Sequence, residues 1–326
     1  MRRAAAFAPA TVSNVAVGFD ILGFAFGAVG DEVTVEATAR PSVRVVEVAD
    51  ATGQLAAGAL PLDPAQNTAT AGLIRLREDL RLEFGFDVWV RKGIALGSGM
   101  GGSAASAVAG LVAANSLLPA PLAEGDLLPY ALEAERVASG AAHPDNVAPC
   151  LFGGMILVVS HDPVRCVCLP VPARVLAVVA HPRVRLDTRD ARAVLRREVA
   201  LEDHVRQSAH LGGFVAGCFA NDLKLVGRSL EDFIIEPQRA ALIPGFARVK
   251  AAALGAGAVG ASISGSGPSV FAWADSDAAA GRVRAAMVEA FESAGVAEVD
   301  SWVAPVSDEG ARVLRLSDNS GQYRPR

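Results

Sequence analysis

The chain has 326 residues, of which 52% are hydrophobic and 20% are charged, and its formal net charge is −5. This length suits about two domains, and this composition excludes extensive disorder. The acidic balance provides no basic surface for nucleic acid, and no apolar run approaches the ~20 residues of a membrane span. We therefore expect a folded protein that binds small molecules and neither nucleic acid nor membranes.

The cysteines show neither paired C-x-x-C ligand sets nor the spacing of a disulfide framework. Unpaired thiols are typical of a reducing compartment. The basic start, Met1 to Ala4, lacks the long apolar stretch of a leader peptide. We expect a cytoplasmic protein with four free thiols, namely Cys150, Cys166, Cys168 and Cys218.

The first half of the chain alternates predicted strands with predicted helices. Apolar and polar residues alternate as in strands, or form a short apolar run, at 31–39, 43–48, 86–90 and 155–160. Helical spacing with capping residues (Asn67 or Thr68 at one start, Gly140 at one end) predicts helices at 67–84, from 103 to about 117, and 124–139.

Recurring prolines at 163, 170 and 172 mark a boundary, which we place between domains 1–164 and 165–326. The polar tail from about Ser317 has no packing pattern, and we expect it to fray. Mixed neighbouring strands and helices indicate two-layer α+β domains. Beyond the boundary we predict strands at 175–180, 259–264, 270–274 and 299–303, and helices at 188–198, 203–221, 246–254 and 278–293.

The glycine-rich stretch from Leu96 to Ser106 runs directly into the predicted helix from 103. Glycine lets backbone N–H groups turn to one side, and a helix N-terminus adds unpaired N–H groups and a positive dipole end. Such a loop suits a phosphate. It contains no lysine, so it is not a Walker-type loop, although it does match G-x-G-x-x-G at Gly97, Gly99 and Gly102.

Two other interpretations of this loop stay open. A dinucleotide fold needs a second strand ending in an acidic residue, but here prolines and another helix follow, so Glu124 and Asp126 begin a helix. A glycine turn needed only for packing is the other interpretation. Under the phosphate interpretation, Ser103 either caps the helix or ligates Mg²⁺.

Four further segments allow both a structural and a functional interpretation. Glu135 suits a solvated helix face or a carboxylate near a metal. Residues 140–149 read as an ordinary turn, in which His143 is structural or catalytic. Asn14 and Asp20, among apolar neighbours, stabilise a turn or meet a ligand. The serine–glycine turn at 262–269 is a plain hairpin or a close approach to the first loop or a ligand.

Three stretches together resemble motifs of the GHMP kinase superfamily, in the right order. Residues 9–20 are similar to P-A-T-S-A-N-L-G-x-G-F-D, residues 96–106 are similar to G-L-G-S-S-A-A, and residues 260–269 contain S-G-S-G-P-S. This resemblance implies a two-domain α+β fold. Its N-terminal domain would be ribosomal protein S5 domain 2-like and would bind ATP, and its C-terminal domain would be ferredoxin-like.

Two more stretches are similar to motifs of the homoserine kinases within that superfamily: H-P-D-N-V-A-P at 143–149 with F-G-G at 152–154, and E-P-Q-R at 236–239 with I-P-G-F at 243–246. This resemblance implies ATP-dependent phosphorylation of the side-chain hydroxyl of L-homoserine, giving O-phospho-L-homoserine in threonine biosynthesis. It also implies a homodimer.

The resemblance also assigns roles to individual residues. Asn14 would bind the reacting hydroxyl, Asp20 the substrate ammonium, and Arg192 and Arg239 the carboxylate, which suits their planar forks. Mg²⁺ would be held by Ser103 and Glu135. The catalytic set would be Asn14, Ser103, Glu135 and Thr188; the substrate contacts Asn14, Asp20, His143, Arg192 and Arg239; and the ATP contacts Ala95, Leu96, Gly97, Ser98, Gly99, Met100, Gly101, Gly102, Ser103, Ala104, Ala105, Gly265, Ser266 and Gly267.

The second motif departs from the family pattern at two positions. Ala95 stands where the family has proline, and Gly102 stands where it has the first serine of G-S-S, so one hydroxyl near the phosphates is missing.

No residue is an obvious strong base, so we expect transition-state stabilisation to dominate catalysis. A kinase for another small alcohol, such as mevalonate, and a non-catalytic nucleotide or amino-acid sensor are the alternative functions.

Overall fold

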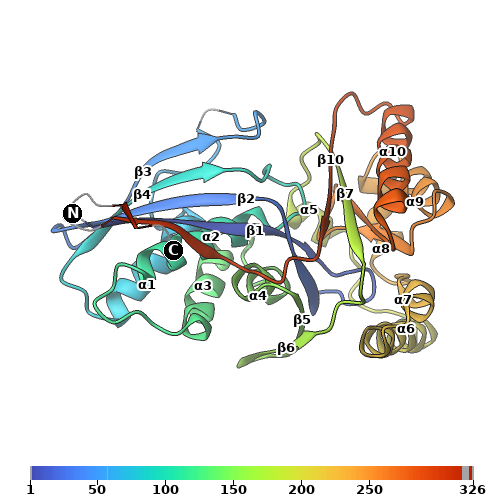
Figure 1. Cartoon of the computed structure of the whole chain (residues 1–326), viewed down its shortest axis with the longest axis horizontal. Coiled ribbons are helices and arrows are strands. Elements are labelled where there is room, and N and C mark those ends of the chain that lie inside the picture. The colour runs from blue at the N-terminus through green and yellow to red at the C-terminus, as the bar shows by residue number, and fades with distance from the viewer. Residues whose placement is uncertain (1, 57, 318–322, 325–326) are drawn as a thin grey trace.

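The structure is a computed structural model that describes residues 2–56, 58–317 and 323–324. Two β-sheets lie side by side along the long axis, and helices cover each of them (Figure 1). In the described ranges, no helix is long and apolar enough to cross a membrane. Most of the tail that was expected to fray lies outside the described residues.

The first sheet has eight strands within the described part of the chain, in the order β12-β11-β1-β2-β4-β3, with β5 and β6 attached through β2. All neighbours are antiparallel except β3 and β4, which the helix α1 (Thr68–Asp79) connects. The strands are β1 (Arg3–Ser13), β2 (Leu22–Thr38), β3 (Val43–Asp50), β4 (Gly85–Lys92), β5 (Met155–His161), β6 (Val164–Leu169), β11 (Arg312–Ser317) and β12 (Tyr323–Arg324).

Strand β1 is missing from the predicted elements, although it pairs with β2 along its whole length. Its buried positions alternate only as far as Ala8, where they are alanines, and every residue from Ala8 to Ser13 is buried. Alanine has a low strand propensity and hides the period-2 pattern that valine or isoleucine would display. The small side chains suit a strand that lies directly against a helix, since α2 packs on β1 and β2.

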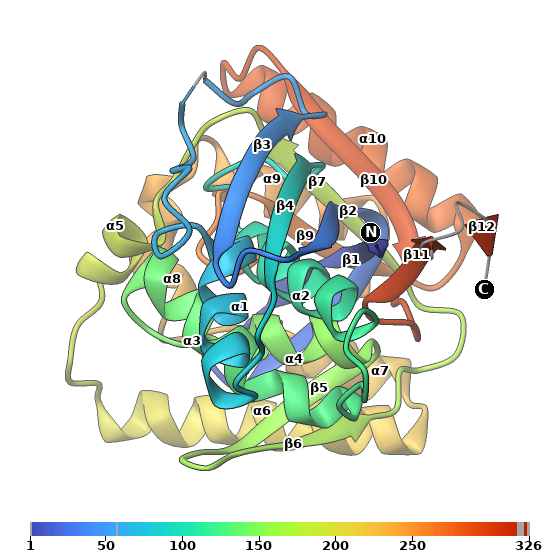
Figure 2. The same cartoon turned by 90° about the vertical axis from the view of Figure 1, so that its left-hand side faces the viewer.

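Helices lie against one face of this sheet (Figure 2). Two predicted caps are confirmed: the Asn67 side chain accepts a hydrogen bond from Ala69 N (3.0 Å), and Gly140 ends α3 with φ 76°. The predicted helix at 124–139 begins as a 3₁₀ turn. The elements are α1 (Thr68–Asp79), α2 (Gly102–Asn115), the 3₁₀ helix η1 (Glu124–Leu127), α3 (Leu128–Ser139) and α4 (Pro144–Phe152).

The turn interpretation of residues 140–149 is wrong from Pro144 onward, because α4 begins there. Pro144 occupies the first turn of this helix, where a missing N–H is tolerated. Pro149 lies inside the helix, where proline normally interrupts the pattern. This second proline made the segment look like a loop.

The second sheet has the order β10-β7-β9-β8, and all its pairs are antiparallel. The chain order β-α-β-β-α-β with this strand order is ferredoxin-like, as expected. Its strands are β7 (Leu176–Pro182), β8 (Gly260–Ile263), β9 (Val270–Ala274) and β10 (Val299–Pro305). Its helices are α5 (Thr188–Ala193), α6 (Leu201–Ala220), α7 (Leu223–Ser229), α8 (Glu236–Arg239), the 3₁₀ helix η2 (Ala240–Leu242), α9 (Phe246–Gly255) and α10 (Asp277–Ser293).

The predicted helix at 188–198 is too long, because α5 ends at Ala193. Beyond that point Val194 is exposed and Leu195 is only partly buried, so a longer helix would bury little apolar surface. The domain assignment 1–164 and 165–326 stays a prediction. The pairings add that β6, which begins at Val164, and β11, which lies wholly in 165–326, belong to the first sheet.

An aromatic cluster joins the two sheets. Phe24 of β2 packs on Trp273 of β9 with 5.9 Å between ring centroids, and Phe214 of α6 packs on the same indole at 5.6 Å. All three side chains are fully buried. Because each ring comes from a different element, the cluster fixes how the halves of the molecule lie relative to one another.

We predict that Phe24→Ala lowers the free energy of unfolding by about 3–5 kcal/mol, because it leaves a cavity at this junction. Phe219→Ala is the control, since that ring is 64% exposed on α6, and we expect it to change stability by less than ~1 kcal/mol. Urea unfolding followed by fluorescence measures both. Equal effects would contradict the proposed importance of the junction.

Candidate active site

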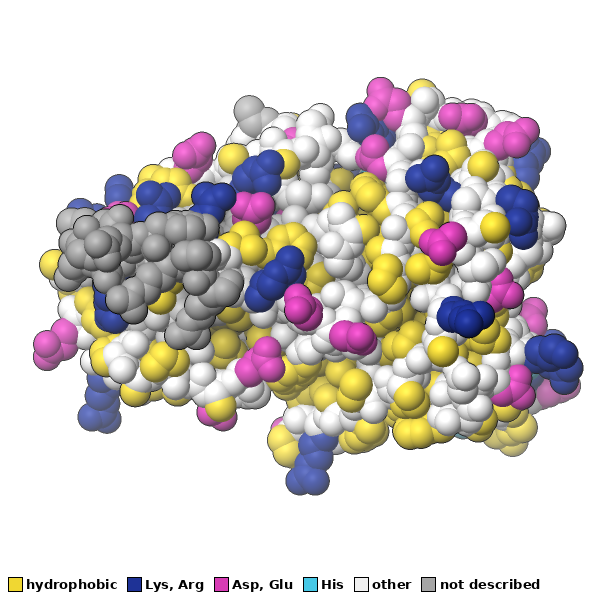
Figure 3. All heavy atoms as spheres, in the orientation of Figure 1, with side chains coloured by type: hydrophobic (Ala, Val, Ile, Leu, Met, Phe, Trp, Pro, Cys, Tyr) yellow, Lys and Arg dark blue, Asp and Glu magenta, His cyan; other side chains and the backbone are white. Residues whose placement is uncertain are grey.

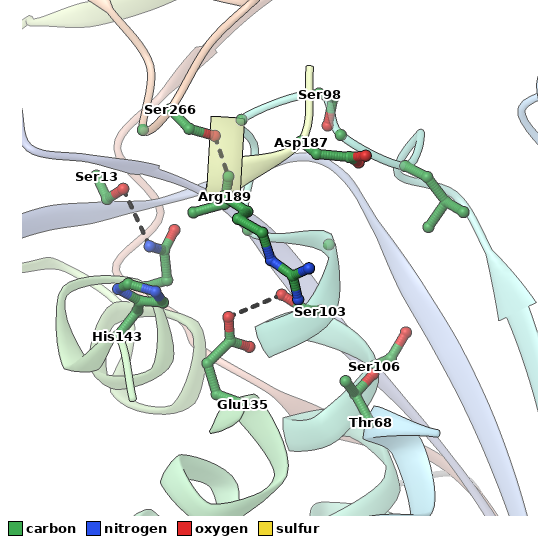
Figure 4. Close-up of a pocket in the computed structure, with 18 of the residues that line it drawn as sticks. Ser13, Thr68, Ser98, Ser103, Ser106, Glu135, His143, Asp187, Arg189 and Ser266 are labelled. Carbon is green, nitrogen blue, oxygen red and sulfur yellow. Dashed lines mark hydrogen bonds between the residues drawn. The ribbon is translucent and has the colours of Figure 1, made fainter. Parts of the chain in front are cut away.

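A cleft of about 580 Å³ lies where the two sheets meet. It is lined by the glycine loop before α2, the segment after β1, the start of α4, α5, α8 and the β8–β9 turn. Figure 4 shows Glu135, Ser103, His143 and Ser266 converging on it from different elements. Most of the residues that sequence reasoning singled out are therefore brought together, although they span more than two hundred positions of the chain.

The glycine loop leads directly into the N-terminus of α2. Gly97, Gly99 and Gly101 have φ values of 62°, 73° and 68°, which other residues adopt at a cost. No acidic residue lies in the first turn of α2, so the positive end of its dipole is not neutralised there. This geometry suits an anion such as a phosphate.

Not every residue of the loop can contact a ligand through its side chain. Residues 95–99 and 101–103 line the cleft. The side chains of Met100, Ala104 and Ala105 are instead buried in the hydrophobic core. Any contact from these three residues to a nucleotide would have to come from their backbone.

The β8–β9 turn packs directly against the glycine loop. Ser264 Oγ donates to Gly99 O (2.8 Å), and Ser269 N donates to Ser98 O (3.2 Å). A Cβ at Gly99 would lie 2.6 Å from Gly267 O, so glycine is required for this approach. Both interpretations of the turn are therefore correct: it is a hairpin, and it approaches the first loop closely. Gly265 and Ser266 line the cleft.

Glu135 is buried beside the first turn of α2, so the interpretation as a solvated helix face is wrong. Ser103 Oγ donates to its Oε1 (2.9 Å). Burial raises the pKa of Glu135 to about 8, against the opposing effect of the Ser103 hydrogen bond. The hydroxyl and carboxylate oxygens are donors that Mg²⁺ prefers, so these residues fit the ion.

No cluster of three or more His, Cys, Asp or Glu side chains that could hold a metal occurs among the described residues. Ser103 and Glu135 would therefore supply only part of a coordination shell. Mg²⁺ typically keeps several waters and binds through one or two carboxylates together with substrate phosphates. This donor set is typical of a nucleotide-dependent site.

The segment after β1 holds a tight turn with an unusual backbone. Asn14, Val15, Ala16 and Asp20 all have positive φ, between 42° and 68°. Asn14 Nδ2 donates to Gly265 O (2.8 Å), and Asp20 N donates to Asn14 Oδ1 (3.0 Å). Asn14 therefore fixes the turn, and it also lines the cleft. Several strained residues in one segment commonly mark a functional site.

Two arginines and Asp20 form the charged end of the cleft. Arg192 makes a bidentate ion pair with Asp20 (2.8 and 3.0 Å). Arg239 is almost fully buried; its Nε donates to Ala191 O (3.0 Å) and its Nη1 to Gly265 O (3.1 Å). Burial, with the nearby Arg192 charge, lowers the pKa of Arg239 to about 10. This value leaves it cationic at neutral pH.

Phe19 lies between these arginines. The guanidinium carbons of Arg192 and Arg239 lie 5.4 and 5.2 Å from the centroid of its ring. Cations over an aromatic face are stabilised by the ring quadrupole. Thr188, at the start of α5, completes this side of the cleft, with its hydroxyl 3.4 Å from that of Ser266.

His143 and Asp145 lie at the start of α4, and both line the cleft. Among the described residues, His143 Nε2 and Asp145 Oδ1 are buried atoms without a hydrogen-bond partner. Burial, with the Arg192 charge, lowers the pKa of His143, and burial, with the Asp20 charge, raises the pKa of Asp145 from 3.8 to about 7. Unpartnered buried polar atoms suit a site that a ligand completes.

Sequence reasoning missed two buried charged residues, Asp145 and Lys92. Asp145 stands two residues after His143, inside a motif that had been singled out, so that motif could have indicated it. Lys92 is one of only three lysines in an arginine-rich chain, which is the only signal that pointed to it.

Comparisons with known proteins identify the family of the chain. The model of the GHMP kinase N-terminal domain matches residues 67–154, and that of the GHMP kinase C-terminal region matches residues 214–293. The fold and the site thus define a GHMP kinase. The fold alone is also shared with a mevalonate kinase from L. major, at a TM-score of 0.66 and 14% identity over 91% of this chain and 94% of that one.

More similar relatives narrow the family. Homoserine kinase from Chloroherpeton thalassium is 46% identical over 321 residues, covering 96% of this chain and 100% of that protein. The enzyme from Xanthomonas campestris pv. campestris is 48% identical over 314 residues, covering 96% and 95%. The crystal structure of homoserine kinase from Cytophaga hutchinsonii has a TM-score of 0.91 and 46% identity over 95% of this chain and 97% of that one. The chain belongs to the homoserine kinase family of GHMP kinases.

We predict that Asp145→Asn stabilises the protein at pH 8 while it impairs kinase activity. In the folded protein the carboxyl holds its proton up to about pH 7, whereas in the unfolded chain it releases it near 3.8. The folded protein binds more protons than the unfolded chain only between these two pKa values, so the stability that this difference contributes is present at low pH and is lost as the pH rises from 3.8 to about 7. The gain in Tm from the amide should grow between pH 5 and pH 8.

Thermal unfolding at several pH values measures this gain. Asp187→Asn is the matched control, because that aspartate also lines the cleft but its side chain is 52% exposed. It should show no such pH-dependent gain. If the Tm of Asp145→Asn is lower than that of the parent protein at pH 8, the prediction is wrong. The carboxylate of Asp145 would then be stabilised by neighbouring groups of the folded protein.

Proposed function

We propose that the protein transfers the γ-phosphoryl group of ATP to the side-chain hydroxyl of L-homoserine, giving O-phospho-L-homoserine and ADP. A bond forms between the homoserine oxygen and phosphorus, the bond between phosphorus and the bridging oxygen of ADP breaks, and the hydroxyl proton is released. The observation that supports this most strongly is the convergence of Asp20, Arg192 and Arg239 on a cleft that also holds the glycine loop.

The charged end of the cleft matches an amino-acid substrate. Homoserine carries a carboxylate, which Arg192 and Arg239 would bind, and an ammonium, which Asp20 would bind. In the structure Asp20 and Arg192 pair with each other. Asp20 thus already contacts a cation, as it would contact the substrate ammonium, and Arg192 already contacts a carboxylate, as it would contact the substrate carboxylate. Mevalonate has no ammonium group and would leave Asp20 without a cationic substrate partner.

The other end of the cleft would hold ATP. The glycine loop and the N-terminus of α2 provide N–H groups for the phosphates, and Ser103 with Glu135 would hold Mg²⁺. When bound, the ion would neutralise charge on the phosphate oxygens. The β8–β9 turn, whose Gly265 and Ser266 line the cleft, would lie between nucleotide and acceptor.

We propose that these residues act mainly by positioning and by charge. Asn14 would orient the reacting hydroxyl through its amide, and the loop N–H groups would stabilise charge on the transferred group. Asp145, with its pKa raised to about 7, is a weak base and would assist removal of the proton only modestly. His143 would complete the contacts to the amino acid.

We also propose a cytoplasmic homodimer that binds neither nucleic acid nor membranes. The family resemblance supports the dimer, and four cysteines without disulfides support a reducing compartment. On the face in Figure 3, acidic and basic side chains are interspersed and do not gather by sign. Analytical ultracentrifugation would measure the oligomeric state, and a single species at the monomer mass would contradict the dimer.

We predict ADP release that depends on both L-homoserine and Mg²⁺. Glu135→Ala should lower kcat by at least ~100-fold, because it removes charge stabilisation at the phosphates, and chelation of Mg²⁺ should abolish turnover. A coupled ADP assay measures both effects. Glu133→Ala, two residues earlier on α3 with its side chain 50% exposed, should retain full activity. A parent protein without homoserine-dependent turnover would be the non-catalytic sensor instead.

We predict that Arg239→Ala raises KM for homoserine about 100-fold and changes KM for ATP less than about twofold. Charge-assisted hydrogen bonds contribute ~1.5–3 kcal/mol each, and Arg239 lies at the amino-acid end. Arg239→Lys keeps the charge but loses the planar fork, so its KM should be intermediate. Steady-state kinetics with each substrate varied in turn measures this, with Arg75→Ala on α1 as control, because that side chain is 59% exposed. Equal increases in both KM values would show that Arg239 is misassigned.

A further inference from the structure

A buried ion pair lies directly beneath the glycine loop. Lys92, the last residue of β4, and Asp31 of β2 have side chains only 3% and 0% exposed, and the ammonium and the carboxylate are in contact. Burial of two charges costs several kcal/mol per ion unless geometry and further hydrogen bonds compensate. The surroundings of this pair show that compensation.

Each charged group of the pair is satisfied by the loop or by the helix that follows it. Lys92 Nζ also donates to Gly102 O (2.8 Å) and to Ser106 Oγ (2.9 Å). Asp31 accepts from Ser106 Oγ (2.6 Å) and from the backbone N–H groups of Gly93 (2.9 Å) and Ile94 (3.2 Å). The pair therefore ties the strand end, the start of the loop and the first turns of α2 to one point.

Gly102 lies immediately above the ammonium. A Cβ at this position would lie 3.5 Å from Lys92 Nζ and 3.1 Å from Ile94 Cγ2. Lys92 and Ser106 also line the cleft, and Figure 4 shows Ser106 on the same helix as Ser103, beside the cleft. The ammonium thus holds the carbonyl of Gly102, the residue directly before Ser103. Ser103 in turn donates a hydrogen bond to Glu135.

We infer that Lys92 is a positioning residue for the nucleotide: through Gly102 O, Ser106 and Asp31, it holds the glycine loop and the start of α2 in the conformation that receives the phosphates. It acts on the loop and does not contact the reacting atoms. This inference rests on the proposed function, since it assigns a residue to the phosphate end of that site.

A second lysine, which is partly buried with its side chain 19% exposed, provides a control. Lys250 pairs with Glu236 (2.5 Å), and Ser262 Oγ donates to the same carboxylate (2.5 Å). Glu236 begins α8, and neither it nor Lys250 is among the residues that line the cleft. Lys92→Met and Lys250→Met thus each remove the cation of a hydrogen-bonded ion pair, and only Lys92 bonds to the glycine loop.

The test compares KM for ATP and for homoserine in these variants, together with ADP binding by calorimetry. We expect Lys92→Met to weaken ADP binding and to raise KM for ATP by ~10- to 100-fold, as small displacements of positioning groups do, with KM for homoserine changed less than about twofold. Lys250→Met should leave ADP binding and KM for ATP unchanged. Ser106→Ala, which removes one of the bonds to Lys92, should have a smaller effect in the same direction.

Removal of Lys92 alone leaves Asp31 buried without a counter-charge, which destabilises the fold. If the single variant does not fold, the double variant Asp31→Asn, Lys92→Met replaces it, because it removes both charges. Its ADP affinity should also be reduced. Unchanged ADP affinity in a folded Lys92 variant, or equal losses for both substrates, would overturn the inference. ADP binding does not depend on the acceptor, so a protein that binds ADP but does not turn over homoserine would contradict only the proposed function.

Discussion

The contact between two glycine-rich segments is the constraint on which the site depends. The loop before α2 belongs to the first sheet and the β8–β9 turn to the second, and they meet through backbone atoms of Gly99, Ser98 and Gly267. Side chains larger than hydrogen would separate them. Because Asn14 and Arg239 both donate to Gly265 O in the same turn, this one contact also sets the distance between the phosphate end and the amino-acid end.

Buried charge is the second physical theme of the cleft. Glu135, Asp145 and Arg239 all have pKa values displaced by burial away from the charged form. A fold selected only for stability would avoid such groups, since each unpaired buried charge is costly. Their cost is reasonable in a cleft that binds a zwitterion and a charged nucleotide, because such ligands interact favourably with charged groups.

The sequence predicted the elements with strong periodicity and the site residues that lie in motifs. Prediction from the sequence was wrong where residues with a low propensity for the element occur in it. The alanines of β1 do not show the pattern of a strand, and Pro149 does not fit the pattern of the helix α4. Local pattern also suggested an exposed Glu135, because burial of a helix face depends on which helix packs against it. Lys92 and its partner Asp31 are 61 positions apart, so no local pattern could reveal their pairing.

The central claim is that the cleft selects an amino-acid alcohol by both of its charges. The most direct measurement is kcat/KM for L-homoserine beside 3-amino-1-propanol, which lacks the carboxylate, 4-hydroxybutanoate, which lacks the ammonium, and mevalonate. Each lost charge removes charge-assisted hydrogen bonds worth ~1.5–3 kcal/mol. We therefore expect kcat/KM to be at least ~10-fold lower for 4-hydroxybutanoate than for L-homoserine, and lower still for 3-amino-1-propanol. Turnover of mevalonate or 4-hydroxybutanoate as efficient as that of homoserine would contradict the account.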